Sequence, residues 1–146
     1  MKCSVFLGWK YRLNVISIIR TANALGFDEV ILTGKKKLFS NKLIQCTKYF
    51  DSTIRMFDEP EEVVAYLKEK KYNLVSMELT PNAKNIVDFK WVKNPAIIVG
   101  HETYGIPEDI LKISKQIMLP MQGKVTCMNV STASAIAMYD HFTKTR

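Results

Sequence analysis

Short runs of apolar, often β-branched residues alternate along the chain with stretches in which apolar residues recur every three or four positions. This alternation is typical of an α/β domain with a mainly parallel sheet flanked by helices. Two runs, Val30–Leu32 and Ile97–Val99, are apolar throughout, as expected for strands covered on both faces. We predict five strands and a weaker sixth that would lie at an edge: Ser4–Leu7, Glu29–Thr33, Leu74–Glu78, Ala96–Gly100, Gln116–Leu119 and, at the edge, Thr53–Met56.

Three longer segments have the helical period. Asn14–Leu25 gathers its apolar residues on one face and ends at Gly26. Asp58–Lys70 begins with Asp58 as a cap, carries acidic residues at its start and lysines at its end, and so matches the helix dipole. Asn129–Phe142 is apolar almost all round, so it is either central or packed against a second subunit. For a chain of this size we favour the second subunit.

The length and composition fit one globular domain. The chain has 146 residues, of which 47% are hydrophobic and 24% charged, which argues against disorder and coiled coil. No apolar run approaches the roughly 20 residues of a membrane span, and the first residues lack the features of a signal peptide. The cysteines Cys3, Cys46 and Cys127 have neither CxxC nor zinc-site spacing, and their odd number disfavours a disulfide framework. We expect a soluble, reduced, cytoplasmic protein.

Positive charge is concentrated in the first third of the chain. The net charge is +7, and residues 1–50 hold nine Lys and Arg against two acidic residues, whereas residues 51–146 hold twelve of each. A localised basic region predicts a polyanion partner, because each Lys or Arg that meets a phosphate releases counterions. The same charge could serve solubility alone, and Lys35–Lys37 could equally form a solvated turn.

Three segments carry candidate chemistry. In the first predicted helix, Arg20 projects roughly opposite the apolar stripe, where it is either a solvated surface residue or a functional one, and Asn14 is by default the helix cap. In the second segment a buried strand runs into Gly100-His101-Glu102-Thr103-Tyr104-Gly105. Strand ends that lead into glycine loops are where open α/β sheets bind ligands, and glycine lets the backbone approach a ligand closely or adopt a positive φ.

The roles of the polar residues in this loop stay open from pattern alone. His101 is either a base or a structural histidine, and we favour the structural role. Glu102 either functions in the loop or caps the next helix. The spacing is not that of a dinucleotide-binding fingerprint, and the chain contains no P-loop. The third segment runs from Leu119-Pro120 to Cys127-Met128-Asn129-Val130-Ser131, where Asn129 or Ser131 could be a plain helix cap.

Taken together, the three segments resemble the motifs of the SpoU/TrmH branch of the SPOUT RNA methyltransferases over almost the whole chain. The first motif, an Asn followed by an Arg, a small residue and a Gly, corresponds to Asn14, Arg20, Ala22 and Gly26. The second motif, Gly-x-Glu and a later Gly, corresponds to Gly100, Glu102 and Gly105. The third corresponds to Leu119-Pro120 and Cys127–Ser131. Ile16 stands where the family usually has Gly, Cys127 where it has Ser, and Thr103-Tyr104 where it often has small residues.

The resemblance implies a single SPOUT domain over residues 1–146 with a C-terminal deep trefoil knot, and a knot and cofactor site in about 96–146. Many members of the family carry an additional N-terminal RNA-binding domain, and we expect no separate RNA-binding domain here. The resemblance also implies a homodimer that transfers a methyl group from S-adenosylmethionine to a ribose 2′-hydroxyl of RNA, with tRNA as the favoured substrate. The alternatives are rRNA, methylation of an RNA base, and a non-catalytic RNA-binding protein that retains the fold. No metal, DNA or membrane partner is expected.

The resemblance also assigns site residues. It implies that Arg20 contacts the hydroxyl and a neighbouring phosphate, in a site that two subunits could share. The catalytic candidates are Arg20, Asn14, Glu102, Asn129 and Cys127. The cofactor-binding candidates are Leu32, Thr33, Gly34, Val99, Gly100, Met118, Leu119, Met121, Met128, Asn129 and Ala133.

Overall fold

The computed structural model describes residues 1–34, 48 and 50–146. Part of the basic region (Lys35–Lys37 and Lys42) and Cys46 lie outside the described residues. The strands are β1 (Cys3–Leu7), β2 (Glu29–Thr33), β3 (Thr53–Phe57), β4 (Asn73–Met77), β5 (Lys84–Asn85), β6 (Pro95–Gly100) and β7 (Lys115–Met118). The helices are α1 (Arg12–Ala24), α3 (Pro60–Glu69), α4 (Glu108–Lys112), α5 (Val130–Thr145) and the short 3-10 helix η2 (Ile86–Asp88).

The strands form one sheet in the order β3-β2-β1-β6-β4-β7-β5, and every pairing between them is parallel. The six predicted strands are confirmed, with β3 at an edge as expected. The two-residue strand β5 was not predicted, because Lys84-Asn85 has no apolar pattern and pairs only through its backbone with β7.

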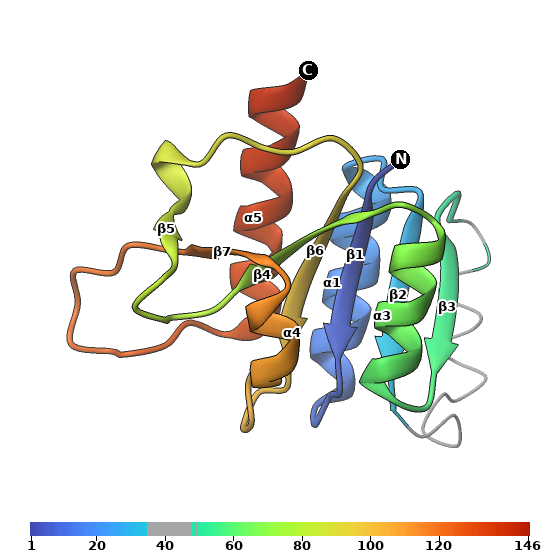
Figure 1. The fold of residues 1–146 in the computed structure, drawn as a ribbon, viewed down its shortest axis with the longest axis horizontal. Helices are drawn as coiled ribbons and strands as arrows, with labels where there is room; N and C mark the ends of the chain where they lie inside the picture. The colour runs from blue at the N-terminus through green and yellow to red at the C-terminus, as the bar shows by residue number, and fades with distance from the viewer. Residues whose placement is uncertain (35–47, 49) are drawn as a thin grey trace.

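Helices cover both faces of the sheet, with α3 and α4 on one face and α1 and α5 on the other (Figure 1). The alternation of side chains along each strand supplies both cores. In β6, Ile97 and Val99 pack toward α1 and α5, whereas Ala96 and Ile98 pack toward α3 and α4. The continuously apolar runs of β2 and β6 are therefore buried on two sides, as their sequence indicated.

Two predicted helix caps are wrong. The N-cap of α3 is Glu59 rather than Asp58, and the Glu62 carboxylate accepts the backbone N–H groups of Asp58 and Glu59, each at 3.0 Å. Helix α1 begins at Arg12, so Asn14 lies inside its first turn and is buried rather than capping it. The side chain of Asn14 is thereby free to bond elsewhere.

Helix α5 packs against α1 and β6, with Ala137 and Met138 fully buried. The opposite side is open in the single chain, where Ile136 and Tyr139 are 39% and 59% exposed. The apolar residues that spread around this helix therefore do not all find partners among the described residues. Within the described part of the chain, no helix is long and apolar enough to cross a membrane.

Candidate functional site

A cavity of about 580 Å³ opens at the carboxyl ends of β4, β6 and β7, within the usual size range of small-molecule sites. The strand order changes direction between β1 and β6, and open α/β sheets bind ligands at the carboxyl ends beside such a point. The cavity wall consists of Tyr11, Asn14, Met77, Glu78, Leu79, Val99, Gly100, His101, Glu102, Thr103, Gly105, Met118, Leu119, Met121, Cys127, Met128, Asn129, Val130 and Ala133.

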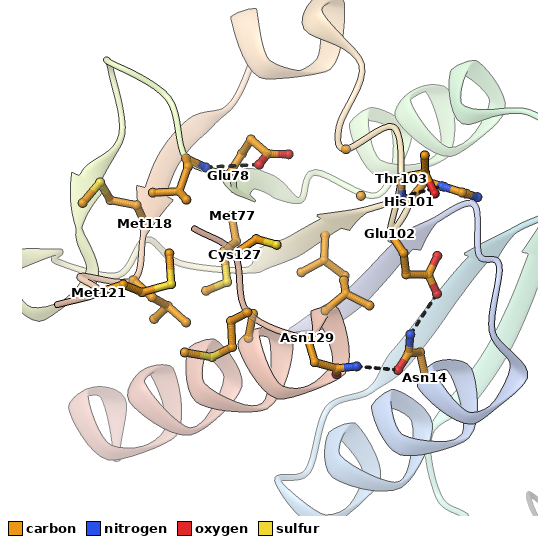
Figure 2. A pocket seen from close by; sticks show the side chains of 18 of the residues that line it. Asn14, Met77, Glu78, His101, Glu102, Thr103, Met118, Met121, Cys127 and Asn129 are labelled. Atoms are coloured by element: carbon orange, nitrogen blue, oxygen red, sulfur yellow. Dashed lines mark hydrogen bonds between the residues drawn. The ribbon is translucent and has the colours of Figure 1, made fainter. Parts of the chain in front are cut away.

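The wall is rich in sulfur and apolar carbon and is acidic. Four methionines and one cysteine line it: Met77, Met118, Met121, Met128 and Cys127. In Figure 2, Met118 and Met121 lie at one end of the cavity, and the loop that carries Glu102 lies at the other. Glu78 and Glu102 contribute carboxylates, and the described lining residues include no lysine or arginine. A wall of this kind suits an uncharged or cationic ligand and does not suit phosphate groups.

One hydrogen-bonded chain links the three sequence motifs beside the cavity (Figure 2). The Asn129 Nδ2 donates to the Asn14 Oδ1 at 3.1 Å, and the Asn14 Nδ2 donates to the Glu102 Oε1 at 2.9 Å. The direction of this chain is fixed at both ends. At one end the Asn129 Oδ1 caps α5 by accepting the backbone N–H groups of Ser131 and Thr132, so its amide nitrogen must face Asn14. At the other end a carboxylate can only accept.

Glu102 ties this chain to the loop that precedes α1. Its carboxylate accepts the backbone N–H groups of Lys10 at 2.9 Å and Tyr11 at 3.3 Å. Partial burial by itself raises the pKa of Glu102, but the hydrogen bonds from Asn14 and the backbone outweigh it, so the pKa is lowered overall. Glu102 is therefore an ionised anchor in the neutral pH range rather than a proton carrier.

The glycines of the second motif allow its loop to fold back on the strand. A Cβ at Gly100 would lie 2.2 Å from the carbonyl carbon of Gly105, which no side chain permits. Gly105 has φ of +69°, and a Cβ there would lie 2.7 Å from the Glu78 Oε2. The positive φ of Gly105 is one of the two uses of glycine that the sequence analysis considered, whereas the close approach at Gly100 is to the backbone of its own loop.

His101 stabilises the loop through its ring and its backbone. Its Nδ1 accepts the backbone N–H of Thr103 at 2.9 Å, and its carbonyl accepts the N–H of Gly105 at 2.9 Å. These contacts support the structural role that we favoured for His101 from the sequence.

The cavity gathers most of the residues that sequence assigned to the site, but not all. Asn14, Glu102 and Cys127 line it, as do eight of the cofactor candidates: Val99, Gly100, Met118, Leu119, Met121, Met128, Asn129 and Ala133. Leu32, Thr33 and Gly34 do not line it. They belong to the end of β2, which is separated from β6 by β1, and Gly34 lies against the indole of Trp9.

Arg20 is also outside the cavity wall. It is exposed on α1, away from the buried residues Val15, Ile18 and Ile19, as the helical pattern predicted. It follows Asn14 by six residues, which places it about 9 Å further along the helix and about 120° around it. Arg20 therefore faces a different direction from the Asn14 side chain in the same chain.

Sequence reasoning missed Met77, Glu78 and Tyr11 as lining residues. Met77 and Glu78 end a strand that was predicted, and the rule that ligands bind at carboxyl ends of strands could have named them. Tyr11 carried no such signal, because it lines the cavity only through the folding of its loop onto Glu102. Among the described residues no group of His, Cys, Asp and Glu is arranged to hold a metal ion.

A profile of the SpoU rRNA Methylase family matches residues 5–139. The chain is 30% identical over 137 residues to the tRNA (guanosine(18)-2′-O)-methyltransferase of Escherichia coli K12, covering 87% of this chain and 56% of the relative. It is 27% identical to the tRNA (cytidine-2′-O-)-methyltransferase TrmJ of Methanocaldococcus jannaschii, covering 92% of this chain and 64% of the relative. The chain thus spans less than two thirds of the length of these curated relatives.

Solved structures share the fold. The crystal structure of the A. aeolicus TrmH/SpoU tRNA modifying enzyme superposes with a TM-score of 0.83 at 26% identity, covering 98% of this chain and 75% of that one. The likeness extends over both cores and over the segments that form the cavity.

Proposed function

The chain belongs to the SpoU rRNA Methylase family, and we propose that it is an S-adenosylmethionine-dependent RNA methyltransferase that modifies a ribose 2′-hydroxyl, with tRNA as its substrate. One observation carries this proposal: Asn14, Glu102 and Asn129, each from a different motif, form a single hydrogen-bonded chain beside the cavity. These hydrogen bonds hold the three segments in fixed positions where the cofactor and the RNA would have to meet. Holding two reactants in the right geometry contributes a large part of the catalysis of a bimolecular step.

S-adenosylmethionine fits the residues that line the cavity. Its adenine would lie among apolar side chains such as Val99 and Leu119, with its polar edges on backbone groups. Its positive charge would be accommodated by a wall that contains Glu78 and Glu102 and, among described residues, no cationic side chain. When bound, this cofactor would supply an electrophilic methyl group. Isothermal titration with S-adenosylmethionine tests the fit independently of activity.

The remaining chemistry concerns the substrate hydroxyl. A ribose 2′-hydroxyl is a weak nucleophile, so the site must align it and help its proton to leave. We assign the alignment to Arg20, which would contact the hydroxyl and a neighbouring phosphate. A guanidinium keeps its proton in proteins, so Arg20 acts by orientation and by stabilising the developing negative charge. Asn129, Asn14 and Glu102 act as positioning residues.

Arg20 would reach this site from a second copy of the chain, in a homodimer. Two observations support this. Arg20 is exposed and does not line its own chain's cavity, and α5 exposes Ile136 and Tyr139 while the adjacent α1 exposes Leu13 to 78%. Exposed apolar side chains on two helices that pack together are what a symmetric interface covers. Light scattering after gel filtration should give twice the mass of 16.7 kDa.

The curated relatives support tRNA as the substrate, since both are named for tRNA methylation, although one name specifies guanosine and the other cytidine. An RNA substrate of this class also leads us to place the protein in the cytoplasm. Analysis of the reaction product identifies which nucleoside receives the methyl group.

We also propose that residues 96–146 thread as a deep trefoil knot. The family resemblance supports it, as does the return of α5 across the sheet to pack on α1 and β6 after β7 has paired with β4. A crystal structure in which α5 does not pass through the loop formed by the preceding segment would contradict this path.

Transfer of labelled methyl groups to unmodified tRNA and rRNA, followed by digestion to nucleosides, tests the function. We expect a 2′-O-methylated nucleoside from tRNA. A methylated base would overturn the ribose assignment, and label in rRNA alone would overturn the substrate. If the protein binds S-adenosylmethionine but labels neither RNA, the enzymatic proposal fails. Arg20→Ala is the matched inactive control, and it should leave cofactor affinity within a few-fold of the wild type.

A further inference from the structure

The loop between β6 and α4 presents an aromatic ring to solvent at the rim of the cavity. Tyr104 is 83% exposed, the most exposed of the large hydrophobic side chains in the described part of the chain. A single exposed apolar residue is common on protein surfaces. The position of Tyr104 sets it apart from the other exposed apolar residues, because its neighbours Thr103 and Gly105 both line the cavity.

The loop that carries Tyr104 is fixed on both sides. The carbonyl and the Nδ1 of His101 accept the N–H groups of Gly105 and Thr103, each at 2.9 Å. Ile106, which follows, is buried and donates its N–H to the Glu78 Oε2 at 3.2 Å. The exposed ring is therefore held by a rigid turn, and a ligand that packs on it would not have to order the loop.

One face of the Tyr104 ring already has a partner. The imidazole of His101 lies 4.7 Å from it, centroid to centroid, with the two planes only 32° apart. His101 lines the cavity, so the pair continues the cavity wall outward into solvent. The exposure of Tyr104 leaves the outer face of the pair open to a planar group.

A lysine and a second exposed tyrosine are anchored to the same loop through Glu102. Tyr11, 54% exposed, lines the cavity, and the Lys10 ammonium lies 5.3 Å from its ring centroid. The Glu102 carboxylate binds the backbone N–H groups of both, which fixes them next to the loop of Tyr104. Since the described cavity wall has no cation, phosphates would have to bind outside it, and Lys10 is placed for that role.

We propose that the Tyr104 ring, backed by His101, is a platform on which an unstacked base of the RNA substrate packs, with Lys10 on the adjoining phosphate. Aromatic rings beside lysines are the chemistry by which proteins bind single-stranded nucleic acid, because every base offers a flat face. In a duplex both faces of a base are covered by its neighbours. The platform therefore selects RNA whose target nucleotide adjoins an unpaired, unstacked one. The inference rests on the proposed function for its choice of RNA as ligand.

Two substitutions at Tyr104 separate stacking from apolar contact. Tyr104→Leu keeps an apolar side chain but removes the ring, and Tyr104→Phe keeps the ring. Against a tRNA substrate, Tyr104→Leu should raise KM about tenfold, within the range for loss of one stacked base, with kcat and S-adenosylmethionine affinity close to wild type. Tyr104→Phe should restore the wild-type KM. Val87→Ala, which shortens an exposed apolar side chain that does not line the cavity, is the control.

A binding experiment keeps the test independent of methyl transfer. Binding of the wild type and both variants is measured to a fluorescent single-stranded RNA and to the same sequence in a duplex. We expect the wild type to prefer the single strand, and only Tyr104→Leu to lose that preference. If Tyr104→Leu binds both RNAs as the wild type does, the platform is refuted even when methyl transfer is intact. A fall in cofactor affinity or kcat without a change in KM would assign Tyr104 to loop structure and also overturn it. If the three proteins bind RNA as expected but the wild type transfers methyl groups to no RNA, the proposed function is overturned and the platform is not.

Discussion

Mixing two inactive variants tests whether Arg20 acts in its own chain or across a dimer. The first variant is Arg20→Ala, and the second is Asn129→Ala, which removes the amide that bonds Asn14 at the cavity. In a homodimer of either variant, both sites lack the side chain that was replaced. Because Arg20 is exposed, its replacement should change the free energy of unfolding by less than about 0.5 kcal/mol.

The position of Arg20 sets the expected activity of the mixture. Arg20 does not line the cavity of its own chain and lies about 9 Å along α1 from Asn14, about 120° around the helix. If the partner supplies it, a mixed dimer has one site with an intact Asn129 and an intact Arg20, and one site with neither. Random exchange of subunits makes about half of the dimers mixed, so about a quarter of the wild-type activity should return.

The assay is methyl transfer to tRNA after the two variants are unfolded together, refolded and compared with each variant treated alone. Co-expression with two affinity tags is an alternative if refolding is slow, and tandem purification then yields mixed dimers with about half of wild-type activity. The reasoning fails if mixed dimers are confirmed by their tags and remain inactive, because Arg20 would then act in cis.

The remaining predictions concern the hydrogen-bonded chain and the glycine loop. Asn129→Ala should lower the free energy of unfolding in urea by about 2–3 kcal/mol, because it removes the cap of α5 and leaves the buried Asn14 Oδ1 without its donor. Asn129→Ser keeps a capping oxygen without placing a carboxylate against the Asn14 Oδ1, and should lose clearly less, so equal losses would contradict this division. The pKa of Glu102 is lowered in the folded protein, so its carboxylate contributes stability above the ordinary value of 4.5 and loses that contribution as pH falls through the lowered pKa. The stability difference between wild type and Glu102→Gln, measured by urea unfolding across pH, should therefore be largest near neutrality and shrink below 4.5; a difference that grows in acid would show the opposite sign. Gly100→Ala should cost at least about 2 kcal/mol and abolish binding of S-adenosylmethionine in calorimetry, since its Cβ would meet backbone at 2.2 Å. Gly123→Ala, with nothing within 4 Å of its added Cβ, is the matched control and should do neither.

Local pattern determined the elements of this fold. Strands β2 and β6 were predicted because a run that is apolar at every position must be buried on both faces, and the amphipathic spacing of α1 predicted the exposure of Arg20. The positive φ of Gly105 follows from the residue type in the same way, whereas the close approach of Gly100 to the Gly105 backbone depends on the folded loop. The resemblance to the family then named most of the residues that line the cavity.

Helix boundaries and caps depend on which hydrogen bonds a polar side chain makes in the folded protein. The pattern of apolar and polar residues along the sequence does not contain that information. Asn14 is a good capping residue, yet it lies within the first turn of α1 because its side chain bonds Glu102 and Asn129, 88 and 115 residues away in the sequence. Glu59 caps α3 in place of Asp58 because Glu62 accepts both backbone N–H groups at that end.

What the sequence determined by itself is therefore the set of elements, their buried faces and the residue types that the chemistry needs. Only the tertiary structure decided that three distant motifs join in one directed hydrogen-bonded chain, that the end of β2 lies apart from the cavity, and that Tyr104 stands at its rim on His101. The physical reason is range. Periodicity and propensity act over a few residues, whereas a hydrogen bond or a ring contact depends on which chain segments the sheet brings together.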